Sequence, residues 1–172
     1  NTPGLRALQD KAALDDLLAQ VMAARSRATP VFLKVAPDLQ PADIDDIVSV
    51  AMARGVAALI VSNTTISRPD LQSKHAGETG GLSGAPLRDL AQQRLIDFRK
   101  ASGGKLGLIG VGGIASAEDA YARIRAGASL VQIYSALVYH GPGLALKINR
   151  QLLKLLQRDG FANISDAVGT DA

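Results

Sequence analysis

The chain contains no cysteine among its 172 residues. It therefore has no disulfide framework, no cysteine-based metal site and no thiol nucleophile. Aromatic residues make up only 3% of the sequence and tryptophan is absent, which leaves few side chains that could stack on nucleic-acid bases. The net charge is +3 and the pI is about 9.4. Because acidic and basic residues are interspersed, nucleic acid is not an expected partner.

Long hydrophobic runs are also absent. No apolar stretch approaches the roughly 20 residues that span a bilayer, although a hydrophobic content of 47% suffices for a buried core. The opening residues (NTPG) resemble neither a signal nor a transit peptide, and they are typical of the middle of a loop. We therefore expect a soluble globular piece of a chain that continues upstream.

Histidine is scarce, and its two occurrences are isolated. His75 and His140 have no second histidine or carboxylate at metal-ligand spacing. Solvated or locally bonded histidines are therefore expected, and no metal site is predicted.

The sequence does contain a regular alternation of helix-type and strand-type apolar patterns. Apolar residues at helical spacing predict helices over 10–25, around 44–51, around 87–98, from 116 to about 127, over 142–159 and, shortly before the end, over 163–168. Short apolar runs predict strands at 31–35, 57–62, 106–111 and 129–134. The polar connection at 63–85 is too long for an ordinary turn, which indicates a functional loop.

Such alternation predicts a parallel sheet with right-handed crossovers. Two architectures fit this pattern: an open doubly wound sheet, and half of an eight-stranded β/α barrel. Lys34, Asn63, Gly113 and Tyr134 all stand in or at the C-terminal part of a predicted strand, where barrel enzymes place their chemistry. The predicted fold class is therefore α/β, half of a TIM-type barrel, with 1–172 as a single partial domain.

Lys34 interrupts an apolar strand. A buried charge costs several kcal/mol unless it meets a partner or a cavity. Either the amine reaches solvent at the end of the sheet, or it points into a polar site and holds an anionic ligand, and the second interpretation is favoured. The run 62–65 (SNTT) ends the next strand with hydroxyls and an amide. These groups suit a planar polar ligand, but they also suit an ordinary turn.

Glycine-rich breaks occur at 80–84 (GGLSG) and 110–113 (GVGG). Glycine lets backbone N–H groups approach a phosphate closely, and a predicted helix follows each break and adds the favourable end of its dipole. Neither break has the spacing of a P-loop, so each is a weak signal alone. Together with Tyr134 and Ser135 they predict a phosphorylated ligand at the position that is usual in β/α barrels.

Six motifs follow one another in the order found in the class 2 (quinone-dependent) dihydroorotate dehydrogenases. They are NTPGLR at 1–6, KVAPD at 34–38, SNTT at 62–65, GGLSG at 80–84, GVGGI at 110–114 and GASLVQIYS at 127–135. The likeness extends from residue 1 to about residue 168. The chain thus resembles the C-terminal half, strands 5 to 8, of such a barrel.

The resemblance implies an FMN-dependent oxidoreductase that oxidises dihydroorotate to orotate in pyrimidine biosynthesis and passes electrons to a quinone. It assigns Lys34 to the flavin, where its charge would stabilise the reduced, anionic ring. Ser62 matches another FMN contact, often a threonine in the family.

Further residues are assigned by the same resemblance. The positions that hold the ribityl phosphate region of FMN are matched by Gly84, Gly113, Tyr134 and Ser135. The positions that bind the pyrimidine are matched by Asn1, Asn63 and Thr64.

The catalytic base of the family is a serine two residues before the position of Asn1, so no catalytic residue is expected within this sequence. The first four barrel strands, and the N-terminal extension that contacts quinone and the cytoplasmic side of the membrane, are likewise expected upstream. Half a barrel leaves unpaired sheet edges. We therefore expect the chain alone to be inactive and not stably folded, with the N-terminal half of the barrel as its partner.

Two alternatives remain open. One is another FMN barrel, either a class 1 dihydroorotate dehydrogenase or a dihydropyrimidine dehydrogenase module, which use a cysteine base. The other is a non-catalytic half-barrel that serves as a binding module. A flavin spectrum that responds to dihydroorotate distinguishes the second from an enzyme.

Overall fold

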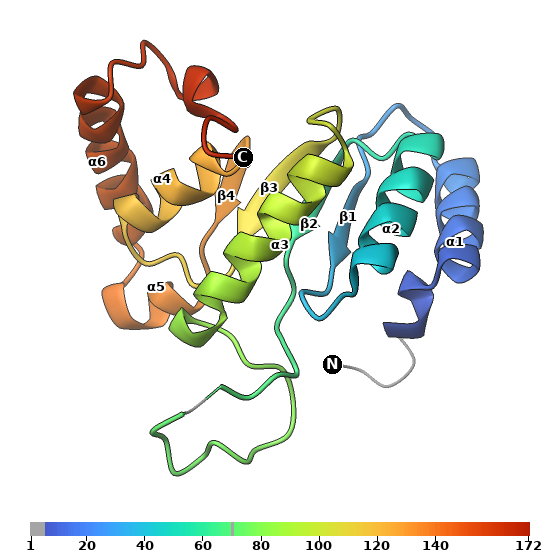
Figure 1. Cartoon of the computed structure of the whole chain (residues 1–172), viewed down its shortest axis with the longest axis horizontal. Helices are drawn as coiled ribbons and strands as arrows, with labels where there is room; N and C mark the ends of the chain where they lie inside the picture. The colour runs from blue at the N-terminus through green and yellow to red at the C-terminus, as the bar shows by residue number, and fades with distance from the viewer. Residues whose placement is uncertain (1–5, 70) are drawn as a thin grey trace.

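The computed structural model describes residues 6–69 and 71–172 (Figure 1). The strands are β1 (Phe32–Val35), β2 (Ala58–Val61), β3 (Gly107–Val111) and β4 (Leu130–Gln132). The helices are α1 (Lys11–Ala24), α2 (Pro41–Ala53), α3 (Arg88–Ala101), α4 (Ala117–Arg125), α5 (Ser135–His140) and α6 (Leu144–Arg158). Short 3₁₀ turns lie at η1 (Arg6–Gln9), η2 (Ala85–Leu87) and η3 (Ile164–Ala167). The predicted alternation of strands and helices is confirmed.

The four strands form one parallel sheet in the order β1-β2-β3-β4. In the register, Lys34 pairs with Ile60, which pairs with Ile109, and Ile109 pairs with Leu130. All four carboxyl ends therefore meet at one edge, the rim, where parallel α/β proteins collect their functional side chains.

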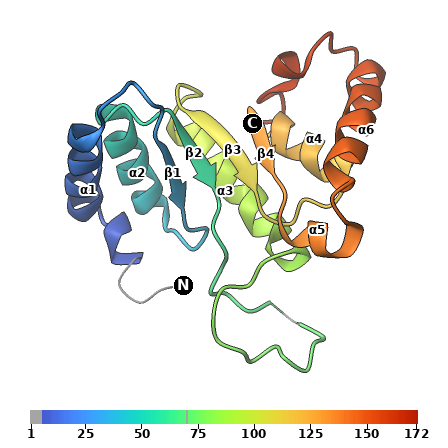
Figure 2. The ribbon, with the colours of Figure 1, turned by 180° about the vertical axis from the view of Figure 1, so that it is seen from behind.

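The two faces of the sheet differ. Val35, Leu59 and Leu108 are almost fully buried on the face that the helices cover. On the other face, Phe32 is 48% and Leu130 61% exposed. Helix α3 lies in front of the sheet in Figure 1 and behind it in Figure 2, where the opposite face is turned to the viewer. A sheet with helices on one face only is the arrangement of a barrel wall, whose other face lines the interior.

Strand β4 differs from the prediction. It ends at Gln132 rather than at residue 134, because it is an edge strand with β3 as its single neighbour. Tyr134 therefore lies beyond the strand, and Ser135 opens helix α5, which was predicted as a turn. Helix α5 is six residues long and buries no side chain. The sequence therefore shows no periodic pattern of apolar residues that would predict it.

Helix α6 packs on α4 over a second apolar cluster. At the end of α6, the Asp159 carboxylate accepts hydrogen bonds from Arg158, Tyr121 and Arg125 at 2.7, 2.9 and 3.1 Å. The Arg158 guanidinium and the Tyr121 hydroxyl lower the pKa of Asp159 to about 2. This cluster fixes the orientation of α6.

Within the described residues, no helix has both the length and the apolar character to cross a bilayer.

Among the residues that the structure describes, Arg123 is the largest fully buried side chain, with 1% exposure. Its guanidinium donates to the Gln92 side chain at 2.9 Å and to the carbonyls of Arg88 and Gly112 at 2.6 and 2.8 Å. Burial lowers the pKa of Arg123 to about 10, so the side chain stays charged at neutral pH. One side chain thereby joins α4, the start of α3 and the glycine break after β3.

Arg123→Met should lower the free energy of unfolding of the complete protein by about 3–5 kcal/mol, because two backbone carbonyls lose a charged donor in a buried position. Denaturant unfolding followed by circular dichroism measures the loss. Arg27→Met is the matched control. Arg27 is exposed, and its replacement should change the free energy by less than about 0.5 kcal/mol. Equal effects of the two substitutions would contradict the structural role of Arg123.

Candidate active site

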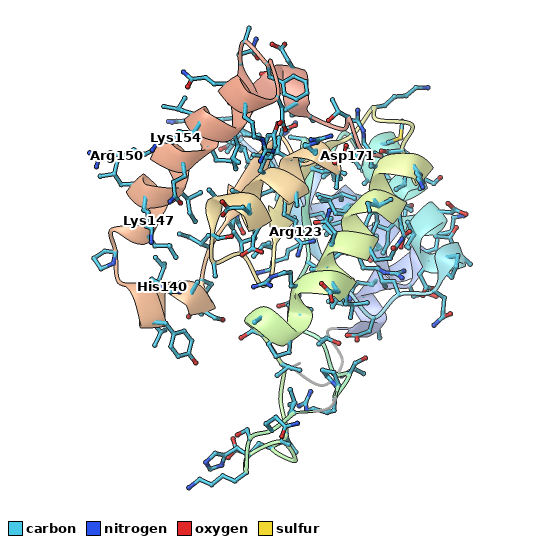
Figure 3. All side chains as sticks on the ribbon, turned by 60° about the vertical axis from the view of Figure 1, so that its left-hand side comes forward. Arg123, His140, Lys147, Arg150, Lys154 and Asp171 are labelled. Atoms are coloured by element: carbon cyan, nitrogen blue, oxygen red, sulfur yellow. The ribbon has the colours of Figure 1, made fainter. Side chains whose placement is uncertain are left out.

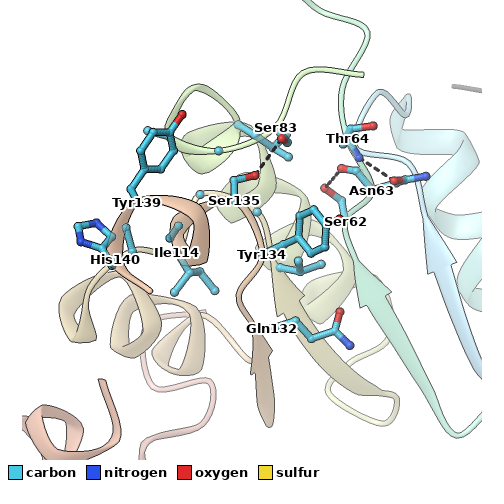
Figure 4. Close-up of a pocket in the computed structure, with 18 of the residues that line it drawn as sticks. Ser62, Asn63, Thr64, Ser83, Ile114, Gln132, Tyr134, Ser135, Tyr139 and His140 are labelled. Atoms are coloured by element: carbon cyan, nitrogen blue, oxygen red, sulfur yellow. Dashed lines mark hydrogen bonds between the residues drawn. The ribbon is translucent and has the colours of Figure 1, made fainter. Parts of the chain in front are cut away.

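A cavity of about 410 Å³ opens at the rim of the sheet (Figure 4). This volume lies within the range of small-molecule sites, roughly 300–1,000 Å³. All eight of the predicted site residues that the structure describes line it: Lys34, Ser62, Asn63, Thr64, Gly84, Gly113, Tyr134 and Ser135. Asn1 lies outside the described residues. Side chains from four strand ends thus share one cavity.

Lys34 reaches the cavity from β1. It occupies the face of the sheet that no helix covers, in register with Ile60 and one residue before the strand ends. None of the ion pairs among residues 6–69 and 71–172 includes Lys34. Its ammonium group therefore brings a positive charge to the cavity that no carboxylate of the described chain neutralises.

The segment after β2 is held by its neighbours on both sides. The Ser62 amide donates to the carbonyl of Val111 at 3.1 Å, and the Asn63 amide donates to the carbonyl of Val35 at 2.7 Å. The Asn63 side-chain oxygen accepts the Thr64 amide at 2.9 Å, and the Ser62 hydroxyl donates to the Asn63 carbonyl at 3.0 Å. The backbone is therefore fixed, while the amide and hydroxyl groups of Asn63 and Thr64 line the cavity.

Asp38 anchors the following loop. Its carboxylate accepts hydrogen bonds from the Thr65 hydroxyl, from the Ile66 amide at 3.2 Å and from the Ser67 hydroxyl at 3.1 Å. Sequence reasoning assigned Asp38 no function, because the groups that donate hydrogen bonds to it lie almost thirty residues away. Its place four residues after Lys34, outside any predicted helix, was the available signal.

Arg68 closes the long polar loop that follows. Its guanidinium donates to carbonyls on both arms of the loop, those of Thr65, Ile66 and Ser67 on one arm and those of Glu78 and Gly80 on the other. A two-way backbone bridge between Thr65 and Leu82 lies at the base. The loop thus leaves the rim and returns to it at a fixed place.

The returning arm meets the end of the sheet at Ser83 and Gly84. The Ser83 and Ser135 hydroxyls are 2.9 Å apart. Gly84 has a φ of 75°, and a Cβ atom there would lie 3.6 Å from the Cβ of Ser135. The connection after β2 and the start of α5 therefore touch, and they close one side of the cavity.

Two arginines orient the glycine break after β3. Arg123 donates to the carbonyl of Gly112 at 2.8 Å, and Arg88 donates to the carbonyl of Gly113 at 3.0 Å. In a trans peptide the carbonyl and the following N–H point in opposite directions. The amides of Gly113 and Ile114 therefore point away from these arginines. Both residues line the cavity, so the geometry suits an anion held by backbone N–H groups.

The N-terminus of α4 offers fewer free amides and less positive charge for a phosphate than the sequence predicted. The Asp119 carboxylate accepts the amides of Ala115 and Ser116, each at 3.0 Å, and Ser116 completes a capping box. These amides are satisfied within the chain, and a carboxylate lies at the positive end of the helix. The expected favourable dipole after this break is therefore offset by Asp119.

The open side of the cavity is lined by residues near the start and end of α5. Tyr134 is 82% exposed, and Tyr139 and His140 lie on the other side of Ser135 from it (Figure 4). Gln132 also lines the cavity and was missed, although a polar residue in an apolar strand is the same signal that marked Lys34. His75 lies in the long loop, where its Nδ1 is 2.7 Å from Glu78.

Comparisons with known proteins agree on one family. The model of the dihydroorotate dehydrogenase family matches residues 1–156. The dihydroorotate dehydrogenase (quinone) of Sphingopyxis alaskensis is 68% identical over the whole of this chain. That of Novosphingobium aromaticivorans is 63% identical over 99% of it. The chain spans 49% of the length of each relative, about half.

Solved structures agree with the sequences. Two crystal structures of Eimeria tenella DHODH, one in complex with ferulenol and one ligand-free, superpose with TM-scores of 0.92 and 0.94 at 37% and 38% identity. Each comparison covers 99% of this chain and 51% or 53% of the other. The four strands and their helices are therefore half of a β/α barrel, as predicted. The chain belongs to the dihydroorotate dehydrogenase family, within its quinone-type class.

Proposed function

We propose that the complete protein oxidises dihydroorotate to orotate in pyrimidine biosynthesis, with FMN as cofactor and a quinone as electron acceptor. In this proposal residues 1–172 are a single partial domain, the C-terminal half of the barrel. One observation carries the proposal: eight positions assigned to FMN or substrate, spread from residue 34 to residue 135, line one cavity.

The residues present fit FMN, an elongated molecule with a planar polar ring at one end and a phosphate at the other. Ser62, Asn63 and Thr64 lie together at one side of the cavity, and Ser83 and Ser135 lie further along it (Figure 4). Lys34 and Ser62 would hold the ring. Gly84, Gly113 and Ser135 would hold the phosphate, since main-chain amides and a hydroxyl are suitable donors. When bound, FMN supplies the acceptor for the hydride of the substrate.

Tyr134 lies between these two groups in Figure 4, and we assign it to the ribityl phosphate region. The pyrimidine would be held by Asn63 and Thr64, together with Asn1. An amide side chain and a hydroxyl offer both donors and acceptors, which matches the alternating N–H and C=O groups of dihydroorotate. The serine base belongs two residues before Asn1 and would act from outside this sequence.

The N-terminal half of the barrel is the proposed partner. Strands β1 and β4 each have one neighbour in the sheet, so each leaves a row of backbone groups free to pair. Phe32 and Leu130 are exposed on the face that would line the barrel interior. We propose that the complete protein is localised at the cytoplasmic side of the membrane, because its quinone acceptor dissolves in lipid.

The complete protein should contain bound FMN, and dihydroorotate should bleach the visible absorbance of the oxidised flavin under anaerobic conditions. Adding a short-chain quinone should restore the absorbance. Spectrophotometry of the purified protein measures both steps. A complete protein that binds no flavin would be a non-catalytic barrel. Bound flavin that dihydroorotate does not reduce would exclude the proposed substrate.

Lys34→Ala should weaken FMN binding about 10- to 100-fold, corresponding to the roughly 1.5–3 kcal/mol of a hydrogen bond to a charged group. Flavin reduction by dihydroorotate should also slow. Flavin content and stopped-flow absorbance measure the two effects. Lys105→Ala is the control, because Lys105 is exposed at the opposite end of the sheet. Flavin content and reduction rate equal to those of the control would refute the assignment of Lys34.

Gly113→Ala should abolish tight FMN binding. A Cβ atom at Gly113, where φ is 72°, would lie 2.6 Å from the Cβ of Arg88 and 2.7 Å from its Cα, so the break must shift. Gly141→Ala is the matched control, since Gly141 has the same φ of 72° and nothing within 4 Å of the added atom. The control should cost only the strain of the backbone at φ 72° and ψ 177°, a region that is essentially restricted to glycine, roughly 1–3 kcal/mol. Flavin content after gel filtration compares them, and retention by Gly113→Ala would contradict the assignment.

A further inference from the structure

Helix α6 has an unusual charge distribution. It contains four basic residues and no acidic residue. Arg158, the last of them, is paired with Asp159 at 2.7 Å. The other three, Lys147, Arg150 and Lys154, occur in none of the ion pairs of residues 6–69 and 71–172. Three cations that form no ion pair in the described part of the chain therefore lie within two turns of one helix.

Two exposed leucines lie beside these cations. The buried side of α6 is made by Leu144, Ile148, Leu152 and Leu156, which follow one another at intervals of four residues and pack in the second apolar cluster.

The opposite side of the helix carries Leu146, Arg150 and Leu153, at i, i+4 and i+7. Leu146 is 54% and Leu153 61% exposed. Lys147 and Lys154 lie together on one side of this row. We call these five residues the outer face of α6.

The outer face is directed away from the rest of the molecule. Lys147, Arg150 and Lys154 lie along one outer edge of α6 in Figure 3, on the far side of the helix from Arg123. In a β/α barrel the helices form the outer ring. We therefore expect neighbouring helices of the closed barrel on the flanks of α6, with the side opposite its buried leucines directed outward.

We propose that the outer face of α6 docks on the surface of a lipid bilayer that contains anionic lipids. Each cation near such a surface is attracted by its negative potential, and the two leucines can bury apolar area at the level of the headgroups. Cations alone would suit any polyanion, but the exposed leucines beside them favour a bilayer over nucleic acid. The apolar side of α6 is used by the core of the protein, so the helix lies against the surface and does not embed.

This inference goes beyond the proposed function, because the reaction at the rim requires none of the five residues. The test uses the complete protein, in which other segments contact lipid as well. Binding is therefore compared between phosphatidylcholine vesicles and the same vesicles with phosphatidylglycerol, by sedimentation. The preference for the anionic vesicles, which should fall with added salt, reports on the cationic face.

The triple variant K147Q/R150Q/K154Q should lose this preference by about a hundredfold, which is roughly 1 kcal/mol for each cation near an anionic surface. R27Q/K100Q/K105Q removes the same charge from exposed residues elsewhere on the molecule and should keep most of the preference. Both variants should reduce flavin with dihydroorotate at the normal rate, which separates this test from that of the proposed function. An equal loss in both variants, or no loss in the first, would overturn the proposal.

Variants of the two exposed leucines distinguish a bilayer from the other molecules or segments that could cover the outer face of α6. L146S/L153S should weaken binding to both kinds of vesicle and lower the free energy of unfolding by no more than about 1 kcal/mol, the helix-propensity cost of two serines. A larger loss would mean that another part of the protein covers the face, and the proposal would fail. It would also fail if duplex DNA binds more tightly than the anionic vesicles and depends on the three cations but not on the leucines.

Discussion

The parallel register of the four strands is the constraint on which the site depends. It sets Lys34, the end of β2, the glycine break after β3 and the end of β4 at the same edge of the sheet. Residues separated by about a hundred positions in the sequence therefore line one cavity. A shift of β1 by one residue would turn Lys34 towards the helices, where the charge would meet the apolar core.

Arg123 sets the orientation of the peptide groups in the glycine break at this rim. The strands bring the glycine break to the right place, but they do not determine how its peptide groups are turned. The buried guanidinium does so by binding the carbonyl of Gly112, with Arg88 binding that of Gly113. The cost of burying a charge is thus offset by hydrogen bonds that also orient the cavity wall. Stability and site geometry are linked through one side chain.

The sequence was sufficient for the elements with a strong period. The predicted helix over 10–25 is α1, the predicted strand at 106–111 is β3, and the helix predicted from 116 to about 127 is α4. Family motifs then identified the residues that meet at the rim. Side-chain anchors such as Asp38, Arg68 and Arg123 could not be predicted, because their partners are distant in sequence or are main-chain groups common to every residue. Helix α5 was missed because it buries nothing.

The hydrogen bonds of Arg68 to both arms of the loop after β2 affect how this loop can vary among related proteins. Because one guanidinium binds carbonyls on both arms of the loop, the segment between the arms forms a ring that is closed at its base. Its outer turn, around residues 72–77, is largely exposed and makes no hydrogen bond to the rim in the described part of the chain. Insertions or deletions there would change the size of the ring and leave Thr64 in place.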